Sequence, residues 1–167
     1  IAGRDFLKHW IDLIAPEYMA VSLGPDFRPD DGSVCARLMR LCVLPVAQEC
    51  KLPFAMMIGV KRQVNPELEL AGDGVGKTDV SAIEELAREY PDVKFMITLL
   101  SRENQHELCV AARKFRNILP FGCWWFLNNP SIIHEITSER IEMLGLTMIP
   151  QHSDAWVLDQ LIYKLSL

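Results

Sequence analysis

Short apolar stretches alternate with helical segments along this chain, and that order most constrains its fold. The stretches cover residues 18–23, 54–60, 95–100, 118–121 and 146–150. Predicted helices cover residues 5–14, 34–50, 81–90, 103–115, 130–144 and 157–165. Strand and helix thus alternate five times, which predicts an α/β fold with a parallel sheet and right-handed crossovers.

Five such units are too few for a closed eight-stranded barrel, which needs about 200 residues or more. Two architectures remain open. The chain is a small open α/β domain, or it is the C-terminal part of a TIM (β/α)8 barrel whose first units lie upstream. In either case residues 1–167 are expected to form a single domain. The chain begins at Ile1 rather than Met, which favours further residues upstream.

Charge and composition narrow the class of protein. The net charge is −5, with acidic and basic residues interspersed, so we expect no nucleic-acid partner and no anionic membrane partner. Half of the residues are apolar, yet no apolar run approaches the ~20 residues of a membrane span. The five cysteines form no C-x-x-C pair, and their odd number predicts the reducing cytoplasm.

Local signals fix several boundaries. Pro45 lies inside the helical pattern of residues 34–50 and predicts a kink or a break there. Asn128 and Asn129 offer a helix N-cap, Pro130 suits the first turn, and Gly145 is typical of a helix end. In the last of these helices the predicted inward residues are Ile133, Ile136, Ile141 and Leu144. Ser81 and Glu84 have the spacing of a capping box.

Unusual side chains gather just past the carboxyl ends of the predicted strands, where α/β folds place their sites. Arg62 follows one strand and is suited to binding a carboxylate, or is a solvated loop charge. Trp124 and Trp125 follow a glycine, and either wall a pocket or fill the core. Asp154 follows the last strand as a metal ligand or a base, or as the N-cap of the final helix.

A glycine-rich segment lies within the long, irregular region from Lys61 to Thr78. Residues 71–78, AGDGVGKT, nearly match the P-loop pattern, with Ala71 in place of the first glycine. A P-loop begins directly after a strand, whereas the preceding predicted strand ends ten residues earlier, at Val60. Nucleotide binding is therefore a minor alternative to a plain glycine-rich turn.

Four stretches together resemble the uronate (glucuronate) isomerases, metal-dependent (β/α)8 barrels of the amidohydrolase superfamily. They are MIGVKR (57–62), SRENQHELCVAARKF (101–115), FGCWWFLNNPSII (121–133) and PQHSDA (150–155). The resemblance implies interconversion of aldo- and keto-hexuronates, such as D-glucuronate and D-fructuronate. It also implies an enediol mechanism assisted by a divalent cation, with zinc as the first expectation.

The family's site residues transfer to this sequence only in part. Arg62 matches the substrate-binding arginine, Trp125 falls in the tryptophan pair over the substrate, and Asp154 matches the metal-site carboxylate that serves as the proton-transfer base. Met57 stands where the family has a histidine ligand, and Trp156 stands where it has an arginine. The family's H-x-H metal pair would lie upstream of these residues.

Three functional hypotheses follow. The first is an isomerase with a modified site, and the second is a non-catalytic or repurposed homologue that binds a sugar acid. The third is the nucleotide-binding domain. For a partial barrel, the strand at residues 18–23 exposes an edge. We expect upstream barrel units, or a second copy in a homo-oligomer, to cover it.

Overall fold

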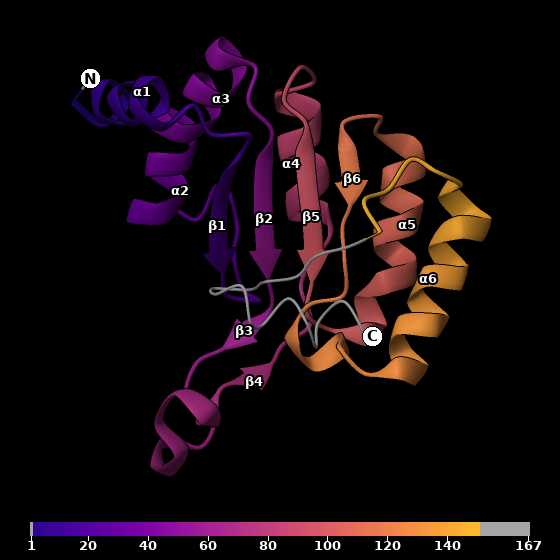
Figure 1. Ribbon diagram of the computed structural model, residues 1–167. Coiled ribbons are helices and arrows are strands. Elements are labelled where there is room, and N and C mark those ends of the chain that lie inside the picture. Colours follow the sequence, from indigo (N-terminus) through magenta and orange to yellow (C-terminus); the bar gives the residue numbers. More distant parts are fainter. Residues whose placement is uncertain (1, 151–167) are drawn as a thin grey trace.

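Four parallel strands form the central sheet of the protein (Figure 1). The computed structural model describes residues 2–150. The sheet strands are β1 (Met19–Leu23), β2 (Phe54–Ile58), β5 (Phe95–Leu99) and β6 (Ile118–Pro120), in the spatial order β1-β2-β5-β6. The helices are α1 (Ala2–Ile14), α2 (Val34–Leu38), α3 (Leu44–Cys50), α4 (Ser81–Glu89), α5 (Gln105–Lys114) and α6 (Pro130–Leu144).

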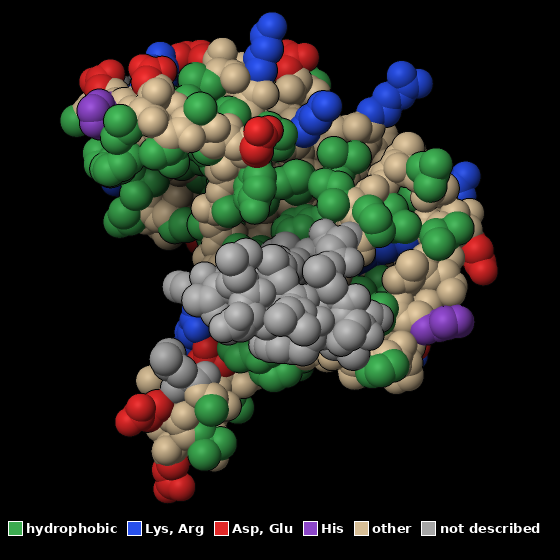
Figure 2. Space-filling view, in the orientation of Figure 1, with side chains coloured by type: hydrophobic (Ala, Val, Ile, Leu, Met, Phe, Trp, Pro, Cys, Tyr) green, Lys and Arg blue, Asp and Glu red, His purple; other side chains and the backbone are tan. Residues whose placement is uncertain are grey.

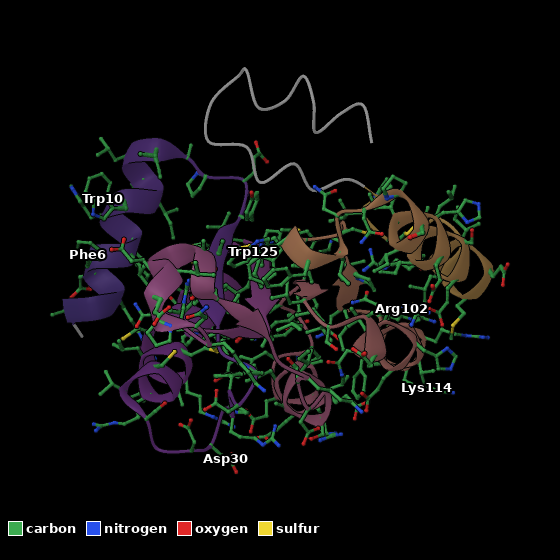
Figure 3. All side chains as sticks on the ribbon, turned by 90° about the horizontal axis from the view of Figure 1, so that it is seen from below. Phe6, Trp10, Asp30, Arg102, Lys114 and Trp125 are labelled. Carbon is green, nitrogen blue, oxygen red and sulfur yellow. The ribbon has the colours of Figure 1, made fainter. Side chains whose placement is uncertain are left out.

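The spatial order of the strands follows their order in the sequence. A doubly wound sheet reverses that order and carries helices on both faces. Here a single core cluster contains side chains of α3, α4 and α5 together with residues from β1, β2, β5 and β6, so these helices pack on one face. Figures 1 and 3 show the same layering. Sequential parallel strands with helices on one side are the arrangement of βα units in a barrel, and the predicted barrel-type fold is confirmed.

The two faces of the sheet differ in composition because side chains alternate along each strand. Residues of the helix-covered face are large and buried, as in Phe54, Met56 and Ile58 of β2. The opposite face carries Ala55 and Met57 from the same strand. The first face is therefore the hydrophobic core, and the second corresponds to the interior of a barrel.

The predicted break near Pro45 takes the form of a π-helical turn at Met39–Val43, between α2 and α3. Proline lacks an N–H, so it cannot donate to the carbonyl four residues earlier, which belongs to Leu41. The Arg4 side chain of α1 donates to that carbonyl instead, with 2.7 Å between Nε and O. The carbonyl that Pro45 leaves without a helical donor thus becomes the attachment point for α1.

An antiparallel ribbon leaves the sheet after β2. It consists of β3 (Val60–Lys61) and β4 (Gly74–Val75), with a 3₁₀ segment at Pro66–Gly72 between them. Figure 1 shows the ribbon projecting beyond the carboxyl ends of the strands. The region from Lys61 to Thr78 is therefore more regular than its sequence suggested.

Two further local predictions are wrong. Ser81 and Glu84 form no capping box, because the Asp79 carboxylate accepts the Ser81 N–H at 2.9 Å. Residues 146–150 form no full strand. Thr147 donates both its N–H and its hydroxyl to the Leu144 carbonyl, which keeps the chain in a turn. Among residues 2–150, pairing there is limited to an isolated bridge between Phe121 and Ile149.

Helix α6 begins and ends at the residues that the sequence predicts. The Asn129 side chain accepts the Ile132 N–H at 3.2 Å, Pro130 begins the helix, and Gly145 ends it with φ +61°. Among the helices of residues 2–150, none is long and apolar enough to span a bilayer.

Candidate active site at the carboxyl edge of the sheet

Backbone hydrogen bonds join the loops that follow the parallel strands. The Gly59 N–H donates to the Leu23 carbonyl at 3.1 Å, and the Leu100 N–H donates to the Ile58 carbonyl at 2.9 Å. These bonds continue the sheet by one residue beyond the strands and hold the loop starts side by side. Figure 3 looks onto this edge. Side chains from loops far apart in the sequence are thereby brought to one surface.

Arg62 lies at the base of the ribbon, where its guanidinium pairs with the Asp73 carboxylate across the two strands. The Asp73 side chain is buried and also accepts the Gln63 N–H at 2.8 Å. That N–H and, to a smaller extent, the Arg62 guanidinium hold the pKa of Asp73 below its ordinary value against the opposing effect of burial. The Arg62 side chain is nevertheless 65% exposed.

A shallow groove of ≈ 580 Å³ lies between the loop after β1 and the ribbon. Its lining includes Asp26 on one side and Lys61 and Arg62 on the other. Lys61 and Arg62 present two cationic side chains to the groove, while the carboxylate of Asp26 also lines it and that of Asp73 pairs with Arg62. The groove is therefore suited to the carboxylate of a small anionic molecule, because Arg and Lys bind such groups by charge-assisted hydrogen bonds.

The tryptophan pair divides into one core residue and one surface residue. Trp124 is buried in a small cluster with Met57, Val60 and Leu100, which ties the loop after β6 to the loops after β2 and β5. Trp125 is 41% exposed and stacks on Phe126, with ring centroids 4.7 Å apart. Figure 3 shows Trp125 near the middle of this edge. An exposed, stacked indole at such a place offers a flat apolar surface to a ligand.

Arg62 and Trp125 are thus placed on the same edge but in separate local clusters. Arg62 is held by the ribbon and Trp125 by the loop after β6. Asp154 and Trp156 lie outside the described residues, so their relation to Arg62 and Trp125 stays a prediction.

Met57 occupies the position that the resemblance assigns to a histidine ligand. It lies next to last in β2, on the barrel-interior face, and packs against the cluster around Trp124. A thioether in an apolar cluster is a poor ligand for a hard or borderline cation. Within residues 2–150 no three His, Cys, Asp or Glu side chains converge as a metal site. The described residues therefore do not fit a zinc ion by themselves.

The glycine-rich segment does not present its backbone as a phosphate cradle. Gly72 closes the ribbon against Asn65, and the Gly76 N–H donates to the Gly59 carbonyl at 2.8 Å. The Thr78 N–H donates to the Asn104 side chain at 2.9 Å. A P-loop needs these N–H groups directed at the ligand. The glycines allow the close backbone contacts of the ribbon, so the segment supports the interpretation as a plain glycine-rich turn.

Sequence reasoning missed a buried polar relay beneath the edge. Gln105 donates through Nε2 to the carbonyls of Leu99 and Ser101, at 2.9 and 3.0 Å. Its Oε1 accepts from Arg140 Nη2 at 2.9 Å, and Arg140 Nη1 donates to the Gly122 carbonyl at 2.7 Å. The relay joins the ends of β5 and β6 through α5 and α6.

A signal for Arg140 exists in the sequence. It lies four residues after Ile136 and four before Leu144, on the stripe of α6 that faces the protein. The predicted inward residue Ile141 is instead 52% exposed, whereas Arg140 is 2% exposed. A charged residue within an apolar stripe is unusual enough to mark a specific role.

Comparisons with solved structures agree with this architecture. A crystal structure of a uronate isomerase from Bacillus halodurans matches 98% of this chain at 58% sequence identity and a TM-score of 0.93. A glucuronate isomerase from Caulobacter crescentus (19% identity, TM-score 0.70) covers 86% of the chain. A uronate isomerase from Thermotoga maritima (14% identity, TM-score 0.64) covers 77%. These last two show likeness of fold alone.

The chain spans 39% of the length of the Bacillus halodurans protein and 36% of each of the other two. No protein-family model and no curated protein sequence matches it. Sequential parallel βα units, with polar and aromatic side chains at their carboxyl edge, define the class as an α/β-barrel protein. Within that class the predicted resemblance is confirmed: the chain is related to the uronate isomerases over nearly all of its length.

Proposed function

We propose that the full-length protein is a uronate isomerase that interconverts aldo- and keto-hexuronates, with D-glucuronate and D-fructuronate as the first pair to test. The observation that carries the proposal is 58% identity to a uronate isomerase across 98% of this chain. An alignment over 98% of the chain includes the loops at the carboxyl edge of the sheet. The active sites of barrel enzymes lie at that edge.

Two residues of this edge are proposed to bind the substrate. Arg62 supplies guanidinium N–H groups to the uronate carboxylate from the groove that it lines with Lys61. Trp125 offers its exposed indole to the apolar face of the sugar. Arg62 already bonds Asp73 through one nitrogen, which fixes the direction of the guanidinium before a substrate arrives. Preorganisation of this kind lowers the entropic cost of binding.

Asp154 is proposed as the base. It takes the proton from C2 of the aldose and returns it at C1, while a hydroxyl proton moves between the two oxygens, so the reaction is redox-neutral overall. Because residues 2–150 do not fit a divalent cation, no step of this proposal passes through one. A zinc ion in the full-length protein stays a prediction, and its ligands, Asp154 among them, would come from outside those residues.

The proposal includes partners and location. Upstream barrel units, or a second copy, cover the open edge at β1. A small uronate is the ligand, with no nucleic-acid or membrane partner. The cytoplasm is the proposed compartment, in keeping with five cysteines that are all free thiols.

Conversion of D-glucuronate by the full-length protein, supplied with Zn²⁺ and followed by ketouronate formation, tests the activity. Asp154→Asn should abolish turnover and leave the unfolding curve unchanged. Arg62→Met should raise KM, because it removes the carboxylate partner. Arg113→Met is the matched control, since Arg113 is an exposed arginine in the last turn of α5, away from the carboxyl edge. Unchanged turnover in Asp154→Asn would remove Asp154 from the mechanism.

A second candidate function is binding of a sugar acid without catalysis. The observation that favours it is Met57, which places an apolar cluster where the family has a metal ligand. Calorimetric binding of D-glucuronate by a folded, zinc-loaded protein that forms no ketouronate would select this alternative over the isomerase.

A further inference from the structure

Arg140 is a buried charged residue whose hydrogen-bond partners in the relay are neutral. Arg140 is 2% exposed, and burial lowers the pKa of its guanidinium. Its partners are one backbone carbonyl and one side-chain amide, and no carboxylate within residues 2–150 forms an ion pair with it. Its Nε has no hydrogen-bond partner among the described residues. Well-packed apolar side chains often stabilise a fold as well as a buried charge does. Stability alone is therefore a poor explanation for an arginine here.

The relay ends at Gly122, the first residue of the loop that carries Trp124 and Trp125. Gly122 has φ +50°, and its carbonyl accepts from Arg140. Its N–H donates to the Ile149 carbonyl at 2.9 Å, so both polar groups of this peptide residue are held. Three residues later Trp125 has φ +46°, a backbone conformation that a bulky residue adopts only when its surroundings impose it.

The other end of the relay is equally fixed. Gln105 is 2% exposed, and its amide bonds two carbonyls at the end of β5, so its oxygen has one available direction. Arg140 spans from that oxygen to Gly122 with two nitrogens of one planar group. A rigid fork between two fixed acceptors sets their separation, which a flexible ammonium could not do.

We propose that Arg140 is a positioning residue that holds the loop from Gly122 to Trp125 in its ligand-ready conformation. It acts through the Gly122 carbonyl and does not touch the substrate. This inference rests on the proposed function for its kinetic consequence, because Trp125 is the proposed substrate contact. Its structural consequence, the orientation of Trp125, is independent of any activity.

The chain offers a matched control. Arg102 lies in the 3₁₀ turn Arg102–Asn104, which leads directly into α5, and joins it to α6 through an exposed ion pair with Glu135 at 2.9 Å. That pair shares the helix–helix interface with the relay and makes no contact with Gly122 among the hydrogen bonds of the described residues. Arg102→Met therefore weakens only the contact between the two helices. Arg140→Met weakens that contact and also removes the hydrogen bond to the Gly122 carbonyl.

The test uses the full-length protein with Arg140→Met, Arg140→Lys and the control. The first measurement is acrylamide quenching and near-ultraviolet circular dichroism of Trp125, taken as the difference from the same variants in a Trp125→Phe background. Both Arg140 variants should raise the Trp125 quenching toward that of free tryptophan, and Arg102→Met should not. If Arg140→Met fails to fold, Arg140→Lys decides, because it keeps the charge but not the fork.

The second measurement is KM for D-glucuronate. Arg140→Lys should raise KM by roughly tenfold, since a misplaced group can cost up to about 10²-fold. That effect should disappear when Trp125 is already Phe. Unchanged Trp125 spectra in both Arg140 variants would overturn the inference. A shifted Trp125 signal in a protein without uronate turnover would uphold the positioning role and reject the proposed function instead.

Discussion

The side-chain amide of Asn104 satisfies both backbone polar groups of Thr78. Its oxygen accepts the Thr78 N–H at 2.9 Å, and its nitrogen donates to the Thr78 carbonyl at 2.8 Å. Asn104 is fully buried immediately before α5, and Thr78 is buried between the ribbon and α4. One side chain thus replaces a strand partner for an irregular segment, and it fixes the outgoing end of the ribbon to the loop after β5.

Removing that amide should destabilise the protein more than a typical surface substitution. Asn104→Ala leaves a buried N–H and a buried carbonyl unpaired, and each costs about 1–3 kcal/mol. We expect a loss of about 2–4 kcal/mol in the free energy of unfolding, measured by urea denaturation. Asn128→Ala, at an exposed asparagine, is the control and should change little. Equal curves for the two variants would show that water replaces the amide.

The ribbon should loosen at acid pH because of Asp73. The Gln63 N–H, and after it the Arg62 guanidinium, lower the pKa of Asp73 beneath its ordinary 3.8. A carboxylate whose folded pKa is depressed stabilises the fold fully above the unfolded value and loses that contribution as pH falls below it. Protection of the Gln63 amide against hydrogen exchange should therefore decline below pH 3.8.

Asp73→Asn separates the effect of the Asp73 charge from that of its hydrogen bond to Gln63. Asparagine keeps an oxygen for the Gln63 N–H but cannot titrate, so its protection factor should be lower at neutral pH and flat with pH. A wild-type profile that parallels the Asp73→Asn profile would show that another group controls the ribbon.

Cysteine labelling should separate exposed thiols from buried ones. Burial raises the pKa of Cys109 to about 11, and the residue is fully buried in α5. At pH 7 its thiolate fraction is then about 10⁻⁴, and the thiolate is the reactive form. Cys35 in α2 is exposed. Iodoacetamide followed by mass spectrometry should label Cys35 in the native protein and Cys109 only in urea. Comparable native labelling of both would mean that α5 opens readily.

Features determined by neighbouring residues were predictable from the sequence. The N-cap at Asn129 and the helix end at Gly145 depend on one side chain or one backbone angle, and both are confirmed. The break before Pro45 was predictable for the same reason. Its π-turn form was not, because the freed Leu41 carbonyl is bonded by Arg4, 37 residues away in the chain.

The rest of the edge depends on contacts that no local pattern encodes. Strands β3 and β4 have two residues each, too few for any periodicity, and the buried Asp73 bonds the Gln63 N–H across the ribbon just beyond them. The role of Arg140 depends on acceptors from two other loops. Arg62 and Trp125 were predicted from their places just past strands, and the resemblance then gave them substrate-binding roles. The structure adds that separate loops hold them on one edge.

The surface beside β1 should make the isolated chain associate. Strand β1 is an edge of the sheet formed by the described part of the chain, and an apolar groove of ≈ 440 Å³ lies between it, α1 and α2. Next to the groove Phe6 is 61% and Leu13 64% exposed. Figure 2 shows hydrophobic side chains gathered over this part of the molecule. Contiguous apolar surface next to an unpaired strand edge is a site that another segment or another copy covers.

Sedimentation velocity on residues 1–167 tests this directly. The wild-type chain should associate with rising concentration, and Leu13→Glu should shift it toward monomer by placing a charge on the apolar face. Leu146→Glu is the matched control, because Leu146 is 96% exposed but lies after α6, far along the chain from β1. If the control dissociates the chain equally, net charge rather than this face controls association. A wild-type monomer at every concentration would show that the edge needs no cover.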